Sequence, residues 1–502
     1  MRWEVVPTTI SLDNFERAGM TINGQFPGPE VRVAMGEAVS IQVTNKLKTP
    51  LTIHWHGITQ KHSNGMDGVP FVTQAPIHPS QSFTYNFTLL QSGTYWYHAH
   101  TGLDSEFIYG TFVVTEPKQE WQRALQLHPE YAHDKELTIL LSETWHRSSE
   151  EIIKGVTSLP FVPLGQPDAV LINGQANRKW DTNFRQGKGH SVITVKSNTR
   201  YRLRLVGGQG SSLLYFSIPG HRFTVIEADG TLVTPFTVDR VPVNSGLRYS
   251  VILQTLPTTN NHYVYAHIAG NNSTAGVAIL HYEGAAAPQP TLVHEPPSLT
   301  LPPTPEFEDR LTTAPLFNQH VYPLPKTVKQ ELIINSTFAK VDGLPMHRIN
   351  NHIHVKRTKL FNPASDQGVF KISSNNKGVQ MILQHLVEKD QPCVQHPWHL
   401  HGHSFYVVAK GAGFYSQADR QRVQSNLPLN PIFRDTFTHF PIPDLNPDPK
   451  VPVTSCGWYA IRFLANNPGP WLMHCHTTTH MLMGKQFILH ETSPKRCRRK
   501  AY

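Results

Sequence analysis

The stretch that decides the fold spans residues 474–480 and reads HCHTTTH. Successive side chains of a strand point to opposite faces, so His474 and His476 share one face and Cys475 takes the other. A further histidine, His480, follows four residues after His476. Imidazole and thiolate are ligands that suit copper. The stretch therefore predicts a strand that carries metal ligands on both of its faces.

Three more histidine pairs have the same spacing, and two of them lie near the N-terminus. They are His54-Trp55-His56, His98-Ala99-His100 and His399-Leu400-His401. Each pair presents two imidazoles on one side of a strand. Two pairs near each end of the chain predict a site for several copper ions, assembled where the two ends meet.

A second set of ligands consists of Cys475, His480 and His396, which stands three residues before the third pair. A site with two histidines and one cysteine is typical of blue-copper electron-transfer centres. The alternatives are histidines with only structural roles, or zinc, the commoner metal for such sets. Ten histidines and one cysteine in four blocks exceed the four ligands of a zinc site, which favours copper.

The length and composition indicate several β-sheet domains. The chain has 502 residues, too many for one hydrophobic core, and its 40 prolines and 33 glycines separate short runs rich in Val, Ile, Thr, Phe and Tyr. We expect all-β Greek-key sandwiches over residues 1–120, 135–285 and 327–502. Residues 286–326 are Pro-rich and predict a linker rather than a packed loop. The first and third segments share a weak repeat, because both contain H-x-H-G and end in a strand with a second pair.

The remaining sequence signals restrict the class of protein. The net charge is +9, and the basic run at residues 495–500 favours a solvated terminus over surface adhesion. The sequence has no basic stripe with interleaved aromatic residues, so nucleic-acid binding is not expected. It has no apolar run of 18 residues, so no transmembrane helix is predicted. Sequons at residues 86, 271, 272 and 335 are compatible with secretion, although no signal peptide precedes the first strand. The four cysteines leave at most one intrachain disulfide if Cys475 binds metal.

The four blocks HWHG, WYHAH, HPWHLHGH and HCHxxxH together resemble the multicopper oxidase family of laccases, ascorbate oxidases and ferroxidases. The resemblance covers essentially the whole chain and implies three cupredoxin-like domains with four copper ions. It assigns the type 2 copper to His54 and His399, and the type 1 copper to His396, Cys475 and His480. The type 3 pair would be held by six histidines: His56, His98, His100, His401, His474 and His476.

The resemblance also implies an activity. One-electron oxidation of a donor at the type 1 site, with Cys475 and His480 in the electron path, would be coupled to four-electron reduction of dioxygen to water. Asp67, in an Asp-Gly turn after the first block, would orient ligands and relay protons. We expect a laccase-like oxidase of phenols or aromatic amines, secreted and monomeric. A ferroxidase or cuprous oxidase, an ascorbate oxidase and a non-catalytic copper-binding protein are the alternatives.

The chain departs from the family at three places. Thr478 stands where many relatives carry an acid, so Asp67 or water must carry more of the proton relay. Lys485 stands at the axial position of the type 1 copper, where an ammonium is electrostatically costly. Either the lysine snorkels away from the copper, or local register presents Met483 instead. Ala75 replaces a family cysteine, which leaves Cys497 without its usual partner. Cys393 and Cys456 are free to pair with each other.

Three positions bear on the choice of donor. Pro219 stands where a laccase carboxylate is expected, and Gln166 replaces a glutamate of yeast-type ferroxidases. Asp168 could serve as a carboxylate, but a plain residue at the start of a strand is the favoured interpretation. His403 closes the third block and would support the ligands without binding copper.

Overall fold

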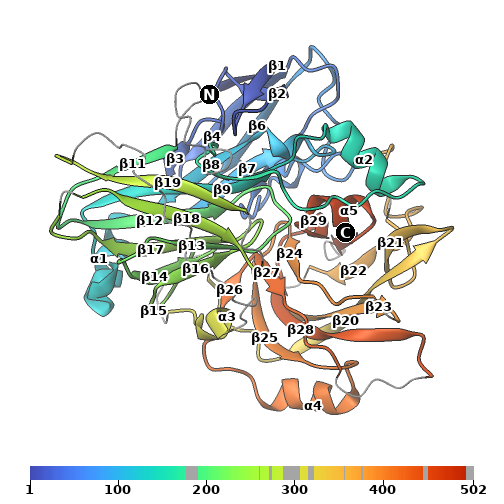
Figure 1. The fold of residues 1–502 in the computed structure, drawn as a ribbon. Coiled ribbons are helices and arrows are strands. Elements are labelled where there is room, and N and C mark those ends of the chain that lie inside the picture. The colour runs from blue at the N-terminus through green and yellow to red at the C-terminus, as the bar shows by residue number, and fades with distance from the viewer. Residues whose placement is uncertain are drawn as a thin grey trace, which may run out of the picture.

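The computed structural model describes residues 1–176, 190–258, 260–270, 274–285, 306–314, 321–354, 357–374, 377–389, 391–444 and 450–492. Its strands form six sheets, two in each of three consecutive parts of the chain. Figure 1 shows the first part in blue, the second in green and the third in orange to red. The expectation of an all-β protein built from three sandwiches is confirmed.

The first part pairs a sheet of order β2-β1-β4-β6 with a sheet of order β3-β8-β7-β5. Alternating burial along β4 shows that one face of each strand enters the core between the two sheets. The elements are β1 (Arg2–Ser11), β2 (Glu16–Ile22), β3 (Val31–Ala34), β4 (Ala38–Asn45), β5 (Ile53–His56), η1 (Asn64–Met66), β6 (Ser82–Thr88), β7 (Gly93–Ala99), η2 (Asp104–Glu106) and β8 (Tyr109–Thr115).

The second part has sheets of order β10-β9-β12-β17-β14-β15 and β11-β19-β18-β13-β16. Helix α1 and turn η3 connect it to the first part. The elements are α1 (Lys118–Leu127), η3 (Pro129–Tyr131), β9 (Lys135–Thr144), α2 (Ser149–Thr157), β10 (Ala169–Ile172), β11 (Ser191–Val195), β12 (Arg200–Gly207), β13 (Leu214–Ser217), β14 (Phe223–Ala228), β15 (Thr231–Val238), β16 (Arg240–Val243), β17 (Arg248–Gln254), β18 (His262–Ile268) and β19 (Ala275–Tyr282).

The third part has sheets of order β21-β20-β23-β28-β25-β26 and β22-β30-β29-β24-β27. Its elements are β20 (Val328–Val341), β21 (Leu344–Ile349), β22 (Phe370–Ser373), β23 (Lys377–Glu388), β24 (His396–Leu400), β25 (Phe405–Gly411), α4 (Gln417–Ser425), β26 (Phe433–Arg434), β27 (Thr436–His439), β28 (Val453–Ala465), β29 (Gly469–Cys475), α5 (Thr478–Leu482) and β30 (Gln486–Thr492).

The Pro-rich segment 286–326 needs a partial correction, because not all of it is an unpacked linker. Residues 306–310 form helix α3, whose Phe307 is buried in the core of the second part. Thr312 and Thr313 make isolated bridges to Pro431 and Val233. This stretch therefore ties the second part to the third, whereas 286–305 and 315–320 lie outside the described residues.

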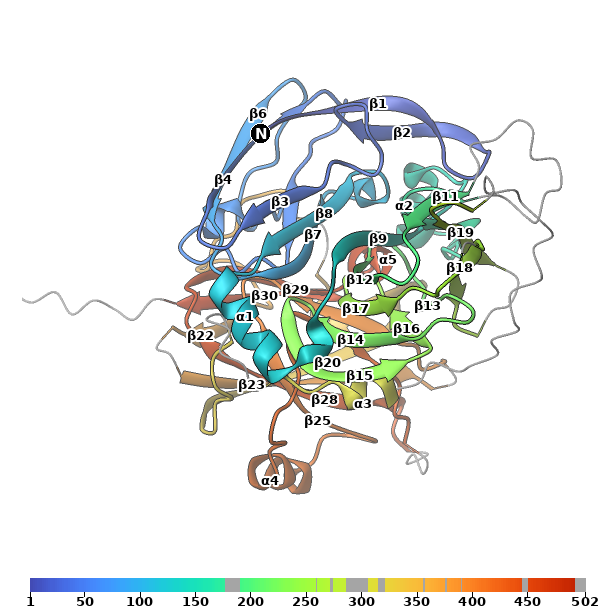
Figure 2. The ribbon, with the colours of Figure 1, turned by 90° about the vertical axis from the view of Figure 1, so that its left-hand side faces the viewer.

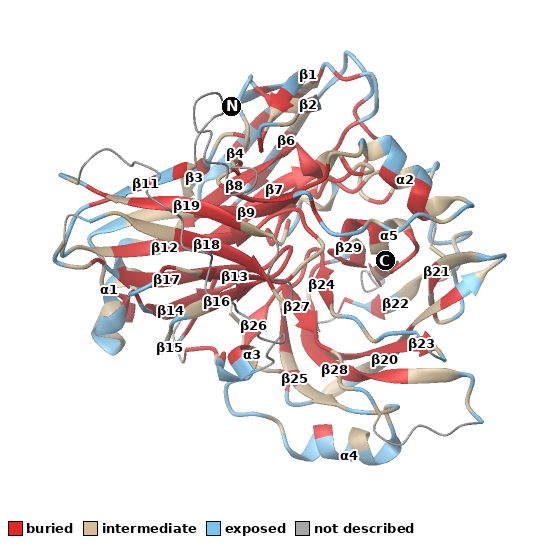
Figure 3. Ribbon diagram, in the orientation of Figure 1, coloured by how far each residue is buried: buried red, intermediate tan, exposed pale blue. Residues whose placement is uncertain are grey.

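The three parts surround a common centre. In Figure 2 the first part lies above the other two, and Figure 3 shows buried residues continuing from the strands of one part to those of the next. Strand β29 and helix α5 lie near this centre (Figure 1). Among the described residues, no helix has the length and apolar character needed to cross a membrane.

Candidate metal centre

Two pairs of strands carry the predicted ligands to the centre of the molecule. β5 pairs with β7 in the first part, with His54 opposite His98. β24 pairs with β29 in the third part, with His399 opposite His474. The alternation of each strand turns Trp55 into the apolar core and leaves its histidine neighbours on the other face. Histidines from the two ends of the chain thereby face one another.

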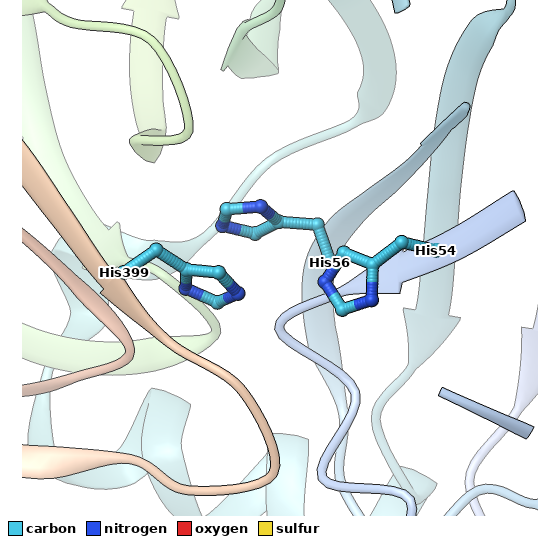
Figure 4. A group of neighbouring side chains, drawn as sticks. All are labelled: His54, His56 and His399. Atoms are coloured by element: carbon cyan, nitrogen blue, oxygen red, sulfur yellow. The ribbon is translucent and has the colours of Figure 1, made fainter. Parts of the chain in front are cut away.

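Two close ring contacts join the first part to the third. The rings of His54 and His401 stack with centroids 3.9 Å apart, and those of His56 and His399 stack with centroids 3.7 Å apart. Figure 4 shows His54 and His56 approaching from a strand of the first part and His399 from the third. The interface of the two parts is thus built from imidazoles.

The possible ligand atoms fall into compact groups, within each of which all donor atoms lie within 4.8 Å of one another. Four of the groups gather at the interface of the first and third parts, and the fifth lies around Cys475. The groups are His54, His56 and His399; His56, His98 and His476; His100, His401 and His474; His54, Asp67 and His401; and His396, Cys475 and His480.

Hydrogen bonds fix which nitrogen of each ring is available to a metal. His54 Nδ1 lies 2.7 Å from the carbonyl oxygen of Asp67, and His399 Nδ1 lies 3.0 Å from that of Asp435. Each Nδ1–H therefore donates to a carbonyl, which leaves the Nε2 lone pair free. The Nε2 atoms of four of these rings are buried and have no partner among the described residues: His54, His98, His100 and His399. Buried nitrogens without partners are costly, so this donor set fits a cluster of metal ions.

Burial keeps these imidazoles uncharged. It lowers the pKa of His56, His98 and His476 well below the ordinary value, and that of His100 to about 3. Neighbouring histidines lower these pKa values further. Neutral imidazole is the form that binds a metal, so the cluster is ready for metal at neutral pH without first losing protons.

Two buried carboxylates hold the cluster from different sides. Asp67 lies 3.0 Å from Nδ1 of His401 and 3.3 Å from Nδ1 of His54. Asp435 lies 3.3 Å from Nε2 of His56 and 3.4 Å from Nδ1 of His399. Each carboxylate therefore reaches one histidine of the first part and one of the third. The sequence drew attention to Asp67 but missed Asp435, which belongs to no motif block.

Asp435 is also the end of a buried chain of charges. Arg248 makes two hydrogen bonds to it, at 2.8 and 2.6 Å, and is 3.2 Å from Asp229, which in turn bonds Arg434 at 2.7 Å. Although burial alone would raise it, the pKa of Asp435 is held well below its ordinary value by Arg248. The arginine comes from β17 of the second part, so this part stabilises the cluster without contributing a ligand.

The Asp67-Gly68 turn has a steric reason. Gly68 has a φ of +87°, and a Cβ there would lie 1.8 Å from the carbonyl oxygen of Ile53. Only glycine lets the turn approach strand β5 so closely. The turn is therefore structural, and it also brings the Asp67 carboxylate beneath the histidines of β5 and β24.

The group around Cys475 is separate from the cluster but joined to it through the chain. The Cys475 sulfur lies 3.6 Å from Nδ1 of His396 and 3.7 Å from Nδ1 of His480. Burial raises the pKa of the thiol to about 11, an effect that nearby Lys485 partly offsets. His480 is only half-buried, whereas the other two members of the group are buried. His480 is thus the member of this group nearest to solvent.

Lys485 does not snorkel to the surface, so that sequence-based alternative is wrong. The residue is 0% exposed, and its Nζ has no hydrogen-bond partner among the described residues. The ammonium lies over the ring of Trp398, 5.5 Å from its centroid. Burial lowers the lysine pKa to about 7. The pKa values of His396 and His480 are lowered first by burial and then by Lys485.

Thr478 borders a small cavity instead of supplying an acid. Its hydroxyl donates to Oε1 of Gln209 at 2.9 Å, and Ser105 donates to the same oxygen at 3.1 Å. Glu106 also lines this cavity, but it is ion-paired with Arg17. The position where the family resemblance implied an acid therefore holds a neutral hydrogen-bonded pair.

The other cysteines and polar residues have simpler roles. Cys393 and Cys456 form a disulfide, and Cys475 is free, whereas Cys497 lies outside the described residues. His403 bonds Glu491 at 2.8 Å and the carbonyl of His401 at 3.3 Å, so it supports the third block.

The residues considered for donor selection lie in two places. Pro219 belongs to a turn between β13 and β14, where its carbonyl accepts a hydrogen bond from His221. Asp168 accepts a hydrogen bond from the His146 amide at 2.7 Å. Gln166 is exposed and follows Leu164, which lines one cavity together with Thr478 and Thr479 of helix α5. The segment with Gln166 therefore lies beside the helix that carries His480.

Comparison with known proteins agrees with this geometry. Models of multicopper oxidase domains match residues 4–119, 135–285 and 342–492. L-ascorbate oxidase from Nicotiana tabacum is 32% identical, over 98% of this chain and 89% of its own length. Laccase-1 from Fomitopsis schrenkii is 32% identical, over 97% of this chain and 86% of its own length.

The chain belongs to the multicopper oxidase family. Among solved structures, Fet3p, a multicopper oxidase that functions in iron import, is 25% identical with a TM-score of 0.76 and covers 98% of this chain and 90% of its own. The laccase from Botrytis aclada is 26% identical with a TM-score of 0.79, over 98% and 87%. The three sandwiches are therefore cupredoxin-like, and the family expected from the four sequence blocks is confirmed.

Membership of the multicopper oxidase family establishes the general activity. The protein is an oxidoreductase that carries four copper ions and passes electrons from a reductant to dioxygen. The groups of buried histidines described above offer the donors that such a set of ions requires. At about 30% identity to both ascorbate oxidases and laccases, the family does not by itself assign the reductant.

Proposed function

We propose that this multicopper oxidase is laccase-like and oxidises phenols, aromatic amines or related donors, with dioxygen as the acceptor. The observation that carries the proposal is that half-buried His480 lies among groups that form no ion pair with it. Of the ion pairs among the described residues, none involves His480, and its pKa is lowered by burial and by Lys485. A neutral aromatic donor suits such a surrounding better than a metal cation does.

Apolar side chains next to helix α5 support the same proposal. Leu159 and Val162 are 61% and 44% exposed, and the nearby Leu164 packs against the same buried cluster as Leu482, two residues after His480. The β20–β21 turn at Gly343 approaches Leu159, since a Cβ there would lie 3.5 Å from the leucine. The segment 158–164 thus offers an apolar face to an aromatic ring near the proposed site of electron uptake.

The assignment of ligands follows the groups in the fold. We assign His54 and His399 to the type 2 copper, and His396, Cys475 and His480 to the type 1 copper. The type 3 ions take His56, His98 and His476 on one side and His100, His401 and His474 on the other, because these trios have mutually close donor atoms. When bound, copper supplies the one-electron redox chemistry and the place where dioxygen is reduced.

The chain's own residues position, connect and shield these sites. Cys475 belongs to the type 1 group, while its neighbours His474 and His476 belong to the cluster, so three consecutive residues at the end of β29 join the two. Asp67 accepts a hydrogen bond from Nδ1 of His401 and keeps that ring's Nε2 directed at the cluster. With Thr478 in place of an acid, Asp67 is the proposed carboxylate for proton supply.

An oxidase of ferrous or cuprous ions is the second candidate. Fet3p is the structural neighbour that favours it. Against it stand the neutral Gln166 beside helix α5 and the engagement of Asp168 with His146. An ascorbate oxidase is the third candidate, which the sequence relatives favour. A protein that binds copper without catalysis is disfavoured, because no ligand of the set is missing.

We propose an oxidising compartment outside the cytosol as the place of action, with the protein acting as a monomer. The disulfide between Cys393 and Cys456 is of a kind that persists in secreted proteins. The sequon residue Asn86 is exposed on β6 and accessible for glycosylation, whereas Asn335 is half-buried. The sequons at residues 271 and 272 lie outside the described residues.

Dioxygen uptake tests the choice among donors. Copper-loaded protein is supplied with a phenol, ferrous iron or ascorbate in parallel, and visible absorption is recorded on the same sample. Uptake with the phenol at a kcat/KM well above those for ferrous iron and ascorbate is the expected result. Preferred uptake with ferrous iron would assign the protein to the metal oxidases, and a blue protein without uptake from any donor would overturn the catalytic proposal.

A further inference from the structure

A histidine that belongs to none of the ligand groups contacts His396 of the proposed type 1 site, on the side of that ring away from Cys475. His385 lies on β23 and is 1% exposed. Its Nε2 is 3.2 Å from Nε2 of His396, and the two rings meet edge to face with centroids 4.3 Å apart. The other nitrogen of His396, Nδ1, is the one that faces the Cys475 sulfur at 3.6 Å. His396 therefore stands between the sulfur and His385.

The direction of this hydrogen bond follows from what a metal requires. A copper ion held by Cys475 and by Nδ1 of His396 needs the Nδ1 lone pair, so the imidazole proton sits on Nε2. His396 Nε2–H then donates to Nε2 of His385, whose own proton sits on Nδ1. With the bond reversed, His396 would carry its proton on Nδ1, and that nitrogen could not bind copper. The contact is thus satisfied in the tautomer of His396 that can bind copper.

The surroundings of His385 keep it able to accept. The groups that act on its charge are Lys485, His439 and His480, and among them there is no carboxylate. The ring of His385 is 1% exposed and meets the rings of His396 and His439 edge to face, with centroids 4.3 and 5.9 Å away. A neutral ring with its proton on Nδ1 offers Nε2 as an acceptor.

The sheet is irregular at the same point. The pairing of β23 with β28 is regular up to Gln384 and Trp458, then shifts so that Leu386 faces Ser455. Two residues of β28, Cys456 and Gly457, therefore lie opposite the single residue His385 of β23. Gly457 has a φ of +92°. A bulge of this kind re-aims the neighbouring side chains, as expected where one side chain must reach a defined partner.

We propose that His385 is a positioning residue of the type 1 site, which fixes the tautomer and ring plane of His396 by accepting its Nε2–H. The inference rests on the proposed assignment of His396 to the type 1 copper. An acceptor at Nε2–H makes the ligand imidazole more basic. A more basic ligand favours the oxidised, more highly charged metal, so His385 lowers the reduction potential of the site.

Two substitutions separate this role from simple packing. His385→Phe keeps a flat ring and removes the acceptor, whereas His385→Gln places an amide oxygen near the position of Nε2. His439→Phe is the matched control: His439 is a 0% exposed histidine close to the same site, with neither ring nitrogen bonded to a ligand. Copper-loaded proteins are compared by redox titration of the blue absorption band and by copper content.

His385→Phe is expected to shift the equilibrium between reduced and oxidised copper about tenfold toward the reduced form, which is about 59 mV for a one-electron couple. His385→Gln and His439→Phe should keep the parental potential. Should His385→Phe fail to fold, a His385→Gln protein with a parental potential supports the proposal, and one shifted as far as about 59 mV overturns it.

The proposal and the proposed function fail in different ways. Equal potentials in the parent protein and His385→Phe, with a full blue band in both, would limit His385 to packing and leave the type 1 assignment in place. A copper-loaded parent protein without any blue band would overturn the type 1 assignment itself.

Discussion

The buried lysine at the type 1 site makes a prediction about stability and pH. In copper-free protein, Lys485 is 0% exposed and has no hydrogen-bond partner among the described residues. Burial lowers its pKa from the ordinary 10.5 to about 7. At about 1.4 kcal/mol per pKa unit, an ammonium at this position costs the folded protein about 5 kcal/mol. Lys485→Met, which removes the charge at similar length, should therefore stabilise the copper-free protein.

The sign of the pH dependence follows from where the proton is bound. Below about pH 7 the lysine is charged in both the folded and unfolded chains, and the full cost is present. Between about pH 7 and pH 10.5 the folded chain has released the proton while the unfolded chain retains it, so the stability of the parent protein rises with pH. The advantage of Lys485→Met should shrink from about 4 kcal/mol at about pH 7 to about 2 kcal/mol at about pH 9.

Urea unfolding of the copper-free proteins measures this difference. The parent protein, Lys485→Met and the control Lys359→Met are unfolded at about pH 6, 7 and 9. Lys359 is an exposed lysine of the third part, so its substitution should change stability by less than about 0.5 kcal/mol at every pH. An advantage of Lys485→Met that is the same at all three pH values would refute the argument, because a lysine without a lowered pKa gives no such slope.

Three further predictions concern the trinuclear site and its support. Thr478→Glu restores an acid next to the cluster and should raise kcat of dioxygen uptake at least about tenfold, whereas Thr478→Gln, of the same shape, should not. Asp67→Asn should weaken copper retention against a chelator by about 10- to 100-fold, because a neutral amide supports His401 less well; copper content after dialysis checks this. Arg248→Met leaves Asp435 buried without its cation and should destabilise the protein by about 3–5 kcal/mol, measured by chemical denaturation, with much of the loss recovered when Asp435→Asn is added.

The residues that could be predicted from sequence are those with local, repeated spacing. The alternation around Cys475 placed it on one face of β29 and its two histidine neighbours on the other, and a period of two residues follows from strand geometry alone. The same alternation, with frequent turn residues, predicted the sandwiches. Spacing of this kind needs no knowledge of which distant segments come together.

The residues that could not be predicted act through contacts between distant segments. Asp435 meets His56, which is 379 positions away in the chain, and nothing around it repeats a motif. His385 contacts His396 at a shift in strand register that leaves no mark in the residue pattern. The alternative in which Lys485 snorkels away from the copper is wrong, because β30 begins directly after it and Trp398 covers its ammonium. Local rules describe the cost of burying a lysine but not whether the fold permits it to escape.

The central claim is that electrons from an aromatic donor enter at the Cys475 group and reduce dioxygen to water at the histidine cluster. The most direct test is the stoichiometry of donor oxidation against dioxygen uptake, with peroxide assayed, in copper-loaded parent protein and in Cys475→Ser. The account predicts about four one-electron oxidations per dioxygen and no peroxide in the parent protein, and no uptake in Cys475→Ser, which retains the trinuclear ligands. Parental uptake by Cys475→Ser, or peroxide as the product of the parent protein, would contradict it.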